Sequence, residues 1–572
     1  MKREIQKIIK KALIELKNTY NWVDFELPEI IIDYPKNEQF GDYTSNIAMV
    51  LAKKLGKKPM EIAEQIAENC HLVPQLADSE PASQEDSGEK NSKMLKKIQP
   101  DAYSAFEKVE VAQPGYLNFY LSKKYLQDLI VKINIEKNTF GNSKLGGGIK
   151  VNNEFISANP TGPLTVGNGR GGFFGDCLSR VLRKAGFEVT SEYYVNDAGG
   201  QVVKLGHSVL KDDQASYVGD YIDKLGKKYA SIDDVVEVGK ISAKEILENV
   251  IKKTVSEKMH ITFDVWMSEQ YLNDEGFDQR AIEILKKKGL TYEQEGAVWL
   301  KTSNFGDDKD RVLIKSDGEN AYIAGDCGYM LNKIGRGFGR IIIGLGADHH
   351  GYVSRLSAVA KALGFSGEFK ISISQLVRIM KDGKEVRMSK RAGNAVYMDE
   401  LIDEIGHDVA RFFFLMYSHD THMNFDLELA KERSSKNPVF YVQYAHARIS
   451  SILEKARENG ILNFQFSCLP DEQENSNYKT NLLIHESELS LLKELSKFPA
   501  LIEEIAGDYN VHKLPHYIIK IADKFHSFYG ACKVIDETNP ELTNARLSLI
   551  SAVKIVLAEA LELIGVDAPE KM

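Results

Sequence analysis

The chain has 572 residues, of which 43% are hydrophobic and 27% charged, as in a globular protein with several hydrophobic cores. At about 100–200 residues per domain, this length predicts three to five domains. The formal net charge of −9 excludes a uniformly basic nucleic-acid coat, although a local basic surface could still bind RNA.

The cysteine pattern argues against a zinc site and against a disulfide framework, because no two cysteines stand at metal-ligand spacing. The five are Cys70, Cys177, Cys327, Cys468 and Cys532. No apolar run approaches the roughly 20 residues of a membrane span, and the charged N-terminus is unlike a signal peptide. We therefore predict a cytoplasmic protein, with no membrane contact and no resident metal.

The beginning of the chain predicts an α+β domain over residues 1–122. Apolar residues recur at helical spacing over 5–16, and 46–69 predicts further helix. The polar segment 78–93 has no apolar period and predicts a flexible surface insertion. Apolar alternation over 109–121, around a Pro-Gly turn, predicts a small sheet that closes the domain.

From residue 150 the pattern becomes strand, loop, helix and strand. Residues 151–160 predict a strand that runs into a loop, 169–185 a helix and 188–195 a second strand. This order is typical of a Rossmann-type, doubly wound parallel sheet. Residues 205–300 predict a helical, charged connective insertion. Two later strands, 311–314 and 341–345, precede a helix over 354–363.

The chain from residue 437 onward is predicted to be helical. Apolar residues from Val442 to Ile452 and from Leu549 to Leu563 follow steps of three and four. Gly565 stands where a helix would stop.

A first candidate site is SANPTGPLTVGNGRGG, residues 157–172, a Pro- and Gly-rich loop that leads into a helix. Such a junction presents free backbone N–H groups to a phosphate. Gly167 would allow close approach of a base or phosphate, and Thr165 and Asn168 offer hydrogen bonds. On glycine content alone, an ordinary tight turn explains the segment equally well.

A second candidate is KDGKEVRMSKRAGN, residues 381–394. Its cations are Lys381, Lys384, Arg387, Lys390 and Arg391. A flexible cationic loop suits a triphosphate and could close on it during reaction. Taken alone, the segment fits a solvated basic loop or a nonspecific RNA contact at least as well.

Together, these segments make the sequence resemble the class I aminoacyl-tRNA synthetases. TVGN (165–168) stands where that class carries HIGH, and RMSK (387–390) where it carries KMSKS. The flanks resemble the arginyl-tRNA synthetase family over nearly the whole chain. They include FGDYTSNIAMVLAKKLGKKP, EFISANPTGPL, EYYVNDAGGQV, GADHHGYVSR, NPVFYVQYAHARI and GVDAPEKM.

The resemblance implies that ATP and L-arginine form arginyl-adenylate with Mg²⁺, and that arginine then passes to the 3′ end of tRNA(Arg) for protein synthesis. It implies catalytic roles for Thr165, Gly167, Asn168 and Lys390. It implies ATP contacts for Pro160, Gly162, Leu164, Val166, Gly169, Arg387, Met388 and Ser389. Catalysis would consist mainly of positioning and charge stabilisation.

The resemblance also implies an arginine pocket, which needs acceptors for a planar guanidinium. The implied residues are Glu154, Asn159, Tyr322, Asp326 and His349. On chemistry alone, Tyr322 could be a packing residue and Asp326 a surface charge. The His349–His350 pair suggests a metal site, but neighbours in a strand point to opposite faces, which favours one pocket histidine. Asn196 and Asp197 are expected to line the same crevice.

The sequence departs from the family at the HIGH-type segment, where Thr165 and Asn168 replace histidines, and before Asp326, where Ala324-Gly325 replaces Thr-Arg. The substitutions at Thr165 and Asn168 motivate one alternative, a non-catalytic paralogue that binds RNA. A ligase for another amino acid is a second alternative, against which the Tyr322/Asp326 pocket and the N-terminal domain argue.

The resemblance implies four regions, which are a tRNA-elbow domain (1–122), a catalytic domain (123–378), the RMSK loop with a stem-contact segment (379–436) and an anticodon-binding domain (437–572). Stacking candidates are Phe440, Tyr441, Tyr444, Phe525 and Tyr529, and phosphate candidates are Lys431, Arg433, Lys436 and Arg448. Most of these aromatics fit a helix core equally well. The family is usually monomeric.

Overall fold

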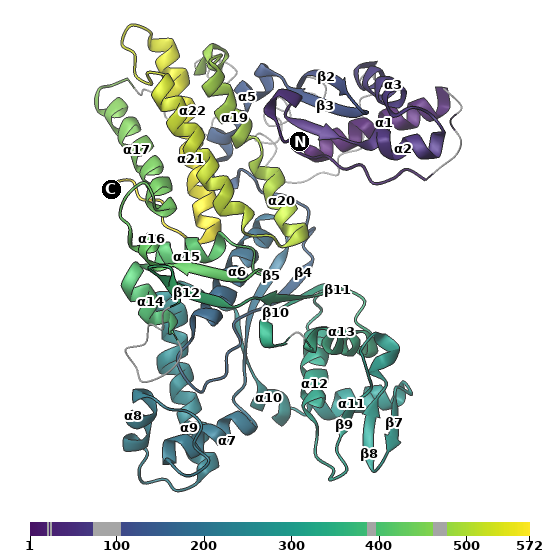
Figure 1. Cartoon of the computed structure of the whole chain (residues 1–572), viewed down its shortest axis with the longest axis vertical. Coiled ribbons are helices and arrows are strands. Elements are labelled where there is room, and N and C mark those ends of the chain that lie inside the picture. Colours follow the sequence, from purple (N-terminus) through teal and green to yellow (C-terminus); the bar gives the residue numbers. More distant parts are fainter. Residues whose placement is uncertain (20–21, 23–25, 73–104, 350, 386–395, 462–477) are drawn as a thin grey trace, which may run out of the picture.

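The computed structural model describes residues 1–19, 22, 26–72, 105–349, 351–385, 396–461 and 478–572. Figure 1 shows an elongated column with an N-terminal arm projecting from one end and two lobes at the other. A helical C-terminal bundle stands on a parallel sheet in the middle of the column. The predicted fold class, with an α+β N-terminal domain and a helical C-terminal domain, is confirmed.

The N-terminal arm packs helices on an antiparallel sheet of order β1-β3-β2. Its elements are α1 (Lys2–Thr19), η1 (Glu38–Phe40), β1 (Tyr43–Ser45), α2 (Ile47–Leu55), α3 (Pro59–Leu72), β2 (Phe106–Ala112) and β3 (Tyr116–Leu121). The helix predicted over 46–69 is two helices, because Gly56 ends α2 in a left-handed conformation. The insertion predicted over 78–93 lies outside the described residues.

The central sheet is parallel throughout, as predicted. Its strands are β4 (Lys150–Glu154), β5 (Glu188–Val195), β6 (Val265–Ser268), β10 (Arg340–Gly346) and β11 (Glu368–Ser374). Their order is β11-β10-β4-β5-β6, so the first strand is central and the chain winds outward on both sides. The winding direction reverses between β4 and β10, where sheets of this kind bind ligands at the carboxyl ends of the strands.

The lobes of Figure 1 surround the lower end of this sheet. The helical elements between residues 166 and 363 are α6 (Val166–Lys184), which lies beside the sheet, and α7 (Gly200–Leu210), α8 (Asp220–Lys228), α9 (Val235–Ile246), η3 (Leu247–Ile251), η4 (Thr254–Lys258), α10 (Glu269–Asp274), α11 (Phe277–Lys287), η5 (Thr302–Phe305), α12 (Tyr322–Gly335), η6 (Ala347–His349) and α13 (Tyr352–Leu363). A small antiparallel sheet contains β7 (Thr291–Gln294), β8 (Ala297–Leu300) and β9 (Arg311–Ile314).

The prediction of a helical insertion over 205–300 is wrong for three strands, because β6 lies within this segment and β7 and β8 lie at its end. Strand β6 lies inside this segment and forms the edge of the central sheet. Its four residues are all partly exposed, so they lack the alternation that predicts a strand. The strand predicted over 311–314 is present as β9, but it pairs with β8 in the small sheet.

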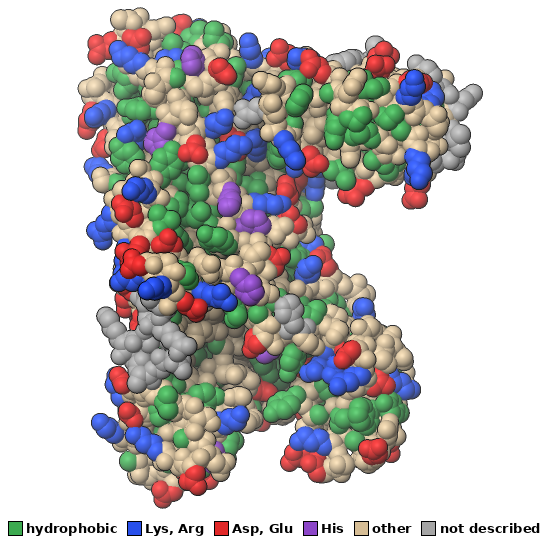
Figure 2. Space-filling view, in the orientation of Figure 1, with side chains coloured by type: hydrophobic (Ala, Val, Ile, Leu, Met, Phe, Trp, Pro, Cys, Tyr) green, Lys and Arg blue, Asp and Glu red, His purple; other side chains and the backbone are tan. Residues whose placement is uncertain are grey.

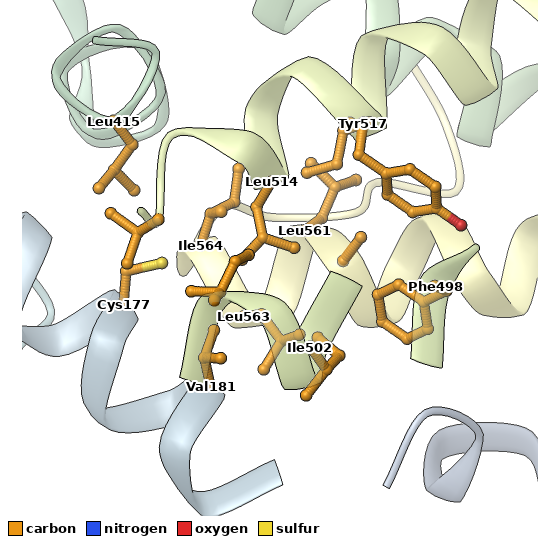
Figure 3. Close-up of a cluster of buried hydrophobic side chains, with 14 of the residues drawn as sticks. Cys177, Val181, Leu415, Phe498, Ile502, Leu514, Tyr517, Leu561, Leu563 and Ile564 are labelled. Carbon is orange, nitrogen blue, oxygen red and sulfur yellow. The ribbon is translucent and has the colours of Figure 1, made fainter. Parts of the chain in front are cut away.

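The C-terminal region joins the central sheet through a continuous apolar core. Its elements are β12 (Val377–Lys381), β13 (Lys384–Glu385), α14 (Met398–Ile405), α15 (His407–Leu415), β14 (Met423–Asp426), α16 (Leu427–Lys431), α17 (Pro438–Glu458), η8 (Thr480–Leu482), α19 (Glu486–Leu495), α20 (Phe498–Asp508), α21 (Lys513–Ala531) and α22 (Pro540–Ile564). Figure 3 shows Cys177 and Val181 of α6 meeting Ile502 of α20 and Leu563 of α22. Gly565 ends α22, as predicted.

Helix α5 (Lys123–Glu136), followed by η2 (Lys137–Thr139), packs on the C-terminal bundle, although the sequence assigned it to the catalytic domain. Gln127 Nε2 donates to the Leu483 carbonyl (3.1 Å), and Asn134 Nδ2 donates to the Ser548 carbonyl (3.1 Å). Of the helices that the structure describes, none is long and apolar enough to cross a membrane. The four described cysteines are free and buried.

Candidate active site

A cavity of about 480 Å³ opens at the carboxyl edge of the sheet, beside the reversal point between β4 and β10. Its wall contains Phe155 and Ile156 after β4, the first turn of α6, the end of β10 through Asp348, and the segment 374–379. A cavity of this size and lining is typical of a site for a small organic ligand.

The TVGN segment forms one wall of this cavity and caps α6. Thr165 accepts a hydrogen bond from the Asn168 backbone N–H, and the Asn168 Oδ1 accepts one from the Thr165 N–H (2.9 Å). The Thr165 hydroxyl also donates to Asn168 Oδ1 (2.9 Å). This capping box explains why the helix begins at Val166 instead of the predicted residue 169. It leaves the exposed Gly167 N–H and the Asn168 amide nitrogen at the cavity wall.

Both flanks of the cationic segment meet at the same wall. Residues 386–395 lie outside the described residues, so the roles of Arg387, Met388, Ser389 and Lys390 stay predictions. The flanking residues Glu385 and Val396 both line the cavity. The Val166 N–H donates to the Val396 carbonyl (3.0 Å), which joins the segment's trailing flank to the first turn of α6.

Several residues predicted to contact ATP stand behind the cavity wall, and only Val166 lines it. The others are Pro160, Gly162, Leu164 and Gly169. Leu164 is buried, and its carbonyl accepts a hydrogen bond from the Met398 N–H (2.8 Å). A Cβ on Gly169 would lie 2.1 Å from Met398 Sδ, and one on Gly162 would lie 2.9 Å from the Tyr221 hydroxyl. These glycines therefore allow close packing of protein groups.

An acidic slot adjoins the cavity on the other side of β4, and we define it by Asp326, Glu269, Asp197 and Glu154. Asp326 Oδ2 is buried and has no hydrogen-bond partner among the described residues. Burial raises the pKa of Asp326 to about 6, with Glu154 adding to the shift and Arg355 opposing it. Burial and the charges of Asp197 and Asp326 raise the pKa of Glu269 to about 7. The slot therefore favours a bound cation.

Asn196 and Asp197, which follow β5, lie at this slot as the sequence predicts. With its amide nitrogen facing Glu269, Asn196 donates to Glu269 (2.5 Å) and lies 3.0 Å from Asn159. Asp197 accepts from Ser268 Oγ (2.7 Å) and from the Gln270 N–H (3.0 Å). Asn159 is thereby brought to the mouth of the acidic slot.

A buried charge cluster fixes Glu154 at the base of the slot. Lys333 is fully buried and pairs with Glu154 (2.8 Å) and Glu192 (3.2 Å). Arg336 pairs with Glu192 as well, and Tyr329 donates to it (2.5 Å). Two cations thus balance two carboxylates here, whereas among the described residues Asp326 has no ion pair and only the charge of Arg355 lowers its pKa, at longer range.

Tyr322 and His349 are placed less centrally than predicted. The Tyr322 ring is 87% exposed, and its hydroxyl lies 4.0 Å from where a Cβ on Gly200 would stand, beside the loop that follows β5. His349 lies in η6 instead of a strand, and it contacts Asp348 (3.5 Å) and Tyr352 on the cavity side. His350 lies outside the described residues, among which no group of three metal-ligating side chains occurs.

The backbone between cavity and slot is strained. Ile156 has φ of 67° and Ser157 has φ of 44°, both in the left-handed region that a β-branched residue rarely adopts. Ser157 Oγ donates to Glu154 (3.3 Å) and accepts from the Tyr194 N–H (3.1 Å). Such strain is concentrated at functional sites, where the surrounding contacts impose it.

Three family models match separate parts of the chain, and curated relatives match nearly all of it. The arginyl tRNA synthetase N terminal domain matches residues 3–84, the class I (R) catalytic domain of tRNA synthetases 237–422, and the DALR anticodon binding domain 442–572. An arginine–tRNA ligase of Listeria monocytogenes is 41% identical, covering 99% of this chain and 98% of the relative. The chain belongs to the arginyl-tRNA synthetase family.

Further members agree with this assignment. The arginine–tRNA ligase of Bacillus subtilis is 38% identical to this chain, and the alignment covers 100% of the chain and 98% of the relative. The structure of Thermus thermophilus arginyl-tRNA synthetase superimposes with a TM-score of 0.76, covering all of both chains at 20% identity, which supports the same fold.

Two parts of the site were not predicted from the sequence. Glu269 begins α10, and only the pairing of β5 with β6 brings it beside Asn196. The segment 374–379 lines the cavity from the end of β11. A serine before a short acidic run, as at Ser268-Glu269, signals a helix start but not a ligand site.

Proposed function

We propose that this chain is an active arginine–tRNA ligase, which forms arginyl-adenylate and pyrophosphate from L-arginine and ATP and then charges tRNA(Arg). The observation that carries the proposal is an acidic slot poor in counter-cations, next to a nucleotide-sized cavity, at the reversal point of a doubly wound sheet.

The arginine side chain enters the acidic slot in this proposal. Asp326 and Glu269 accept hydrogen bonds from the guanidinium, whose planar array of donors suits two carboxylates. Tyr322 stands at the rim, and Glu154 and Asn159 hold the α-amino end. A bound guanidinium returns the pKa values of both slot carboxyls toward their ordinary range, and this change contributes to the binding free energy.

ATP occupies the cavity, with its phosphates at the first turn of α6. The Gly167 N–H and the Asn168 amide donate to the α-phosphate, and the helix end attracts negative charge. Thr165 fixes Asn168 in the cap. Lys390, with Arg387 and Ser389, neutralises the leaving pyrophosphate from the opposite flank. The arginine carboxylate attacks in line, and no covalent enzyme intermediate is required.

Mg²⁺ fits this site as a partner of the nucleotide. Magnesium in phosphoryl-transfer sites is held by phosphates, waters and one or two carboxylates. Asp348 and Glu385 line the cavity and can supply those carboxylates. Bound there, the ion neutralises phosphate charge.

The tRNA contacts the N-terminal arm and the C-terminal helices in this proposal, and the protein acts as a monomer in the cytoplasm. On the helices, Tyr444 and Tyr529 are the stacking candidates, because both are exposed and Arg448 stands over both rings (4.5 and 5.0 Å). Phe525 is fully buried and belongs to the core. Tyr441 donates to Asp523 (2.7 Å), which orients its ring.

The test is ATP–pyrophosphate exchange, measured with and without tRNA(Arg). We expect exchange with arginine and none with citrulline, which has the same shape but a neutral urea group. Lysine serves as a control for charge without the planar donor array. Exchange with another amino acid would favour a ligase of different specificity. Absence of exchange with every amino acid, with tRNA present, would favour an RNA-binding paralogue.

A further inference from the structure

Arg170 is a fully buried cation on α6, two residues beyond Asn168, and only 2% of it is exposed. Its Nη1 donates to the Gln375 carbonyl (2.8 Å) and its Nη2 donates to the Ser418 carbonyl (2.8 Å). No carboxylate within the described part of the chain lies at ion-pair distance. Burial lowers the pKa of Arg170 to about 10, so the side chain remains charged at neutral pH.

The Gln375 carbonyl belongs to a segment that builds the far wall of the nucleotide cavity, and the Ser418 carbonyl belongs to the segment that precedes β14. Gln375 joins β11 to β12 and lines the cavity itself. Its N–H donates to the His419 carbonyl (2.8 Å), so the two segments that Arg170 binds are also bound to each other. Strand β12 then leads through β13 to Glu385, which lies in the first part of the cationic segment, before the RMSK residues.

The trailing flank of the same segment meets the neighbouring residue of α6. A Cβ on Gly169 would overlap the Met398 side chain, and the Met398 N–H donates to the Leu164 carbonyl. Residues 169 and 170 of one helical turn therefore contact the chain on both sides of the cationic segment. This turn also contains the donors proposed for the α-phosphate.

A buried guanidinium that is hydrogen-bonded only to carbonyls is unfavourable, because desolvating a charge costs several kcal/mol and the charge of Asp420 offsets only part of that cost. An apolar side chain of similar volume would fill the same space without this cost. An apolar side chain could not hold two carbonyls at a fixed spacing, whereas the planar guanidinium of arginine is suited to do so.

We infer that Arg170 is a positioning residue, which fixes the distance between the phosphate-binding turn of α6 and the strand leading to the RMSK segment. Arg170 touches neither substrate and acts through Gln375 and Ser418. The inference rests on the proposed ligase function. It specifies that Arg170 acts on ATP and not on arginine, since its contacts lie on the cavity side of β4.

The test compares Arg170→Met and Arg170→Lys with the wild type in arginine-dependent exchange, with tRNA present. Lysine retains the charge but cannot span both carbonyls. We expect Arg170→Met to raise the KM for ATP about tenfold, because small misplacements of a reacting group carry large costs. The KM for ATP of Arg170→Lys should lie between the values for the wild type and for Arg170→Met. The KM for arginine should stay within about twofold, as for independent sites.

Arg411→Lys is the matched control. Arg411 is equally buried, contacts α6 through Asp176 and donates to the Met259 carbonyl (3.3 Å), but it binds no segment of the cavity wall. We expect a lower Tm with an unchanged KM for ATP.

Unchanged KM for ATP in both Arg170 variants, with activity lost only in proportion to Tm, would overturn the inference while the ligase function stands. A tenfold increase in the Arg411 control would overturn it as well. A wild type without exchange would refute the ligase function and the inference together. If Arg170→Met does not fold, Arg170→Lys and Arg170→Gln decide the matter by the same two KM values.

Discussion

Replacing Asp326 with asparagine should weaken arginine binding and stabilise the empty protein at the same time. The folded-state pKa of this carboxyl is about 6 against an ordinary value of 3.8, a difference of about 2 units. At 1.36 kcal/mol per unit, an ionised Asp326 costs the folded state about 3 kcal/mol at pH 7. This cost is absent below about pH 4, grows between about pH 4 and 6, and is constant at higher pH. Asparagine removes it.

The same substitution removes a buried partner of the guanidinium. Truncating one member of a buried, hydrogen-bonded charge pair costs about 2–5 kcal/mol, so the KM for arginine should rise about 10²-fold or more. The KM for ATP should not change. Thermal unfolding and exchange kinetics on one preparation measure both effects, and saturating arginine should raise the Tm of the wild type only. A variant that melts lower when empty and keeps its KM for arginine would refute the assignment of Asp326 to the substrate.

Three further predictions follow from the geometry. The KM for arginine should rise as pH falls below about 7, because Glu269 and then Asp326 take up protons and no longer attract a cation; a KM for arginine that stays flat between pH 5.5 and 8 would contradict the slot. Gly169→Ala should lower the free energy of unfolding by about 1–3 kcal/mol through overlap with Met398, and a second change, Met398→Ala, should restore it; failure of that rescue would mean that the contact is unimportant. Lys333→Met should lower the free energy of unfolding by about 3–5 kcal/mol in urea titration, because two buried glutamates lose their shared cation, and a loss below 1 kcal/mol would show that the cluster is dispensable.

Local signals in the sequence predicted the regular elements well. Strand β5 matches its predicted bounds, and α22 ends at Gly565, because apolar periodicity and a glycine stop are properties of the segment itself. The start of α6 was placed three residues late. Thr165 and Asn168 satisfy each other across one helical turn, and asparagine is an uncommon member of such a cap.

Long-range arrangement was less predictable. Strand β6 is recognisable only by its pairing with β5, since its four residues do not alternate in burial. Glu269 could not be connected with Asp326 from sequence, because separate elements bring them together. Gly169 was predicted to contact ATP, yet it makes room for the Met398 side chain. A glycine in the sequence indicates that another group packs close to the backbone, but it does not show whether that group is a ligand or a protein side chain.

The strained turn at Ile156 and Ser157 stands between two sets of walls that share almost no elements. The amino-acid side is built from the ends of β5, α10 and α12, and the nucleotide side from α6, β10 and β11. Substitutions could therefore change the acidic slot, and with it the amino-acid side chain that is bound, while the nucleotide cavity continues to bind ATP. Among the described residues, the short stretch after β4 borders both the slot and the cavity, so a substitution there should affect both sites.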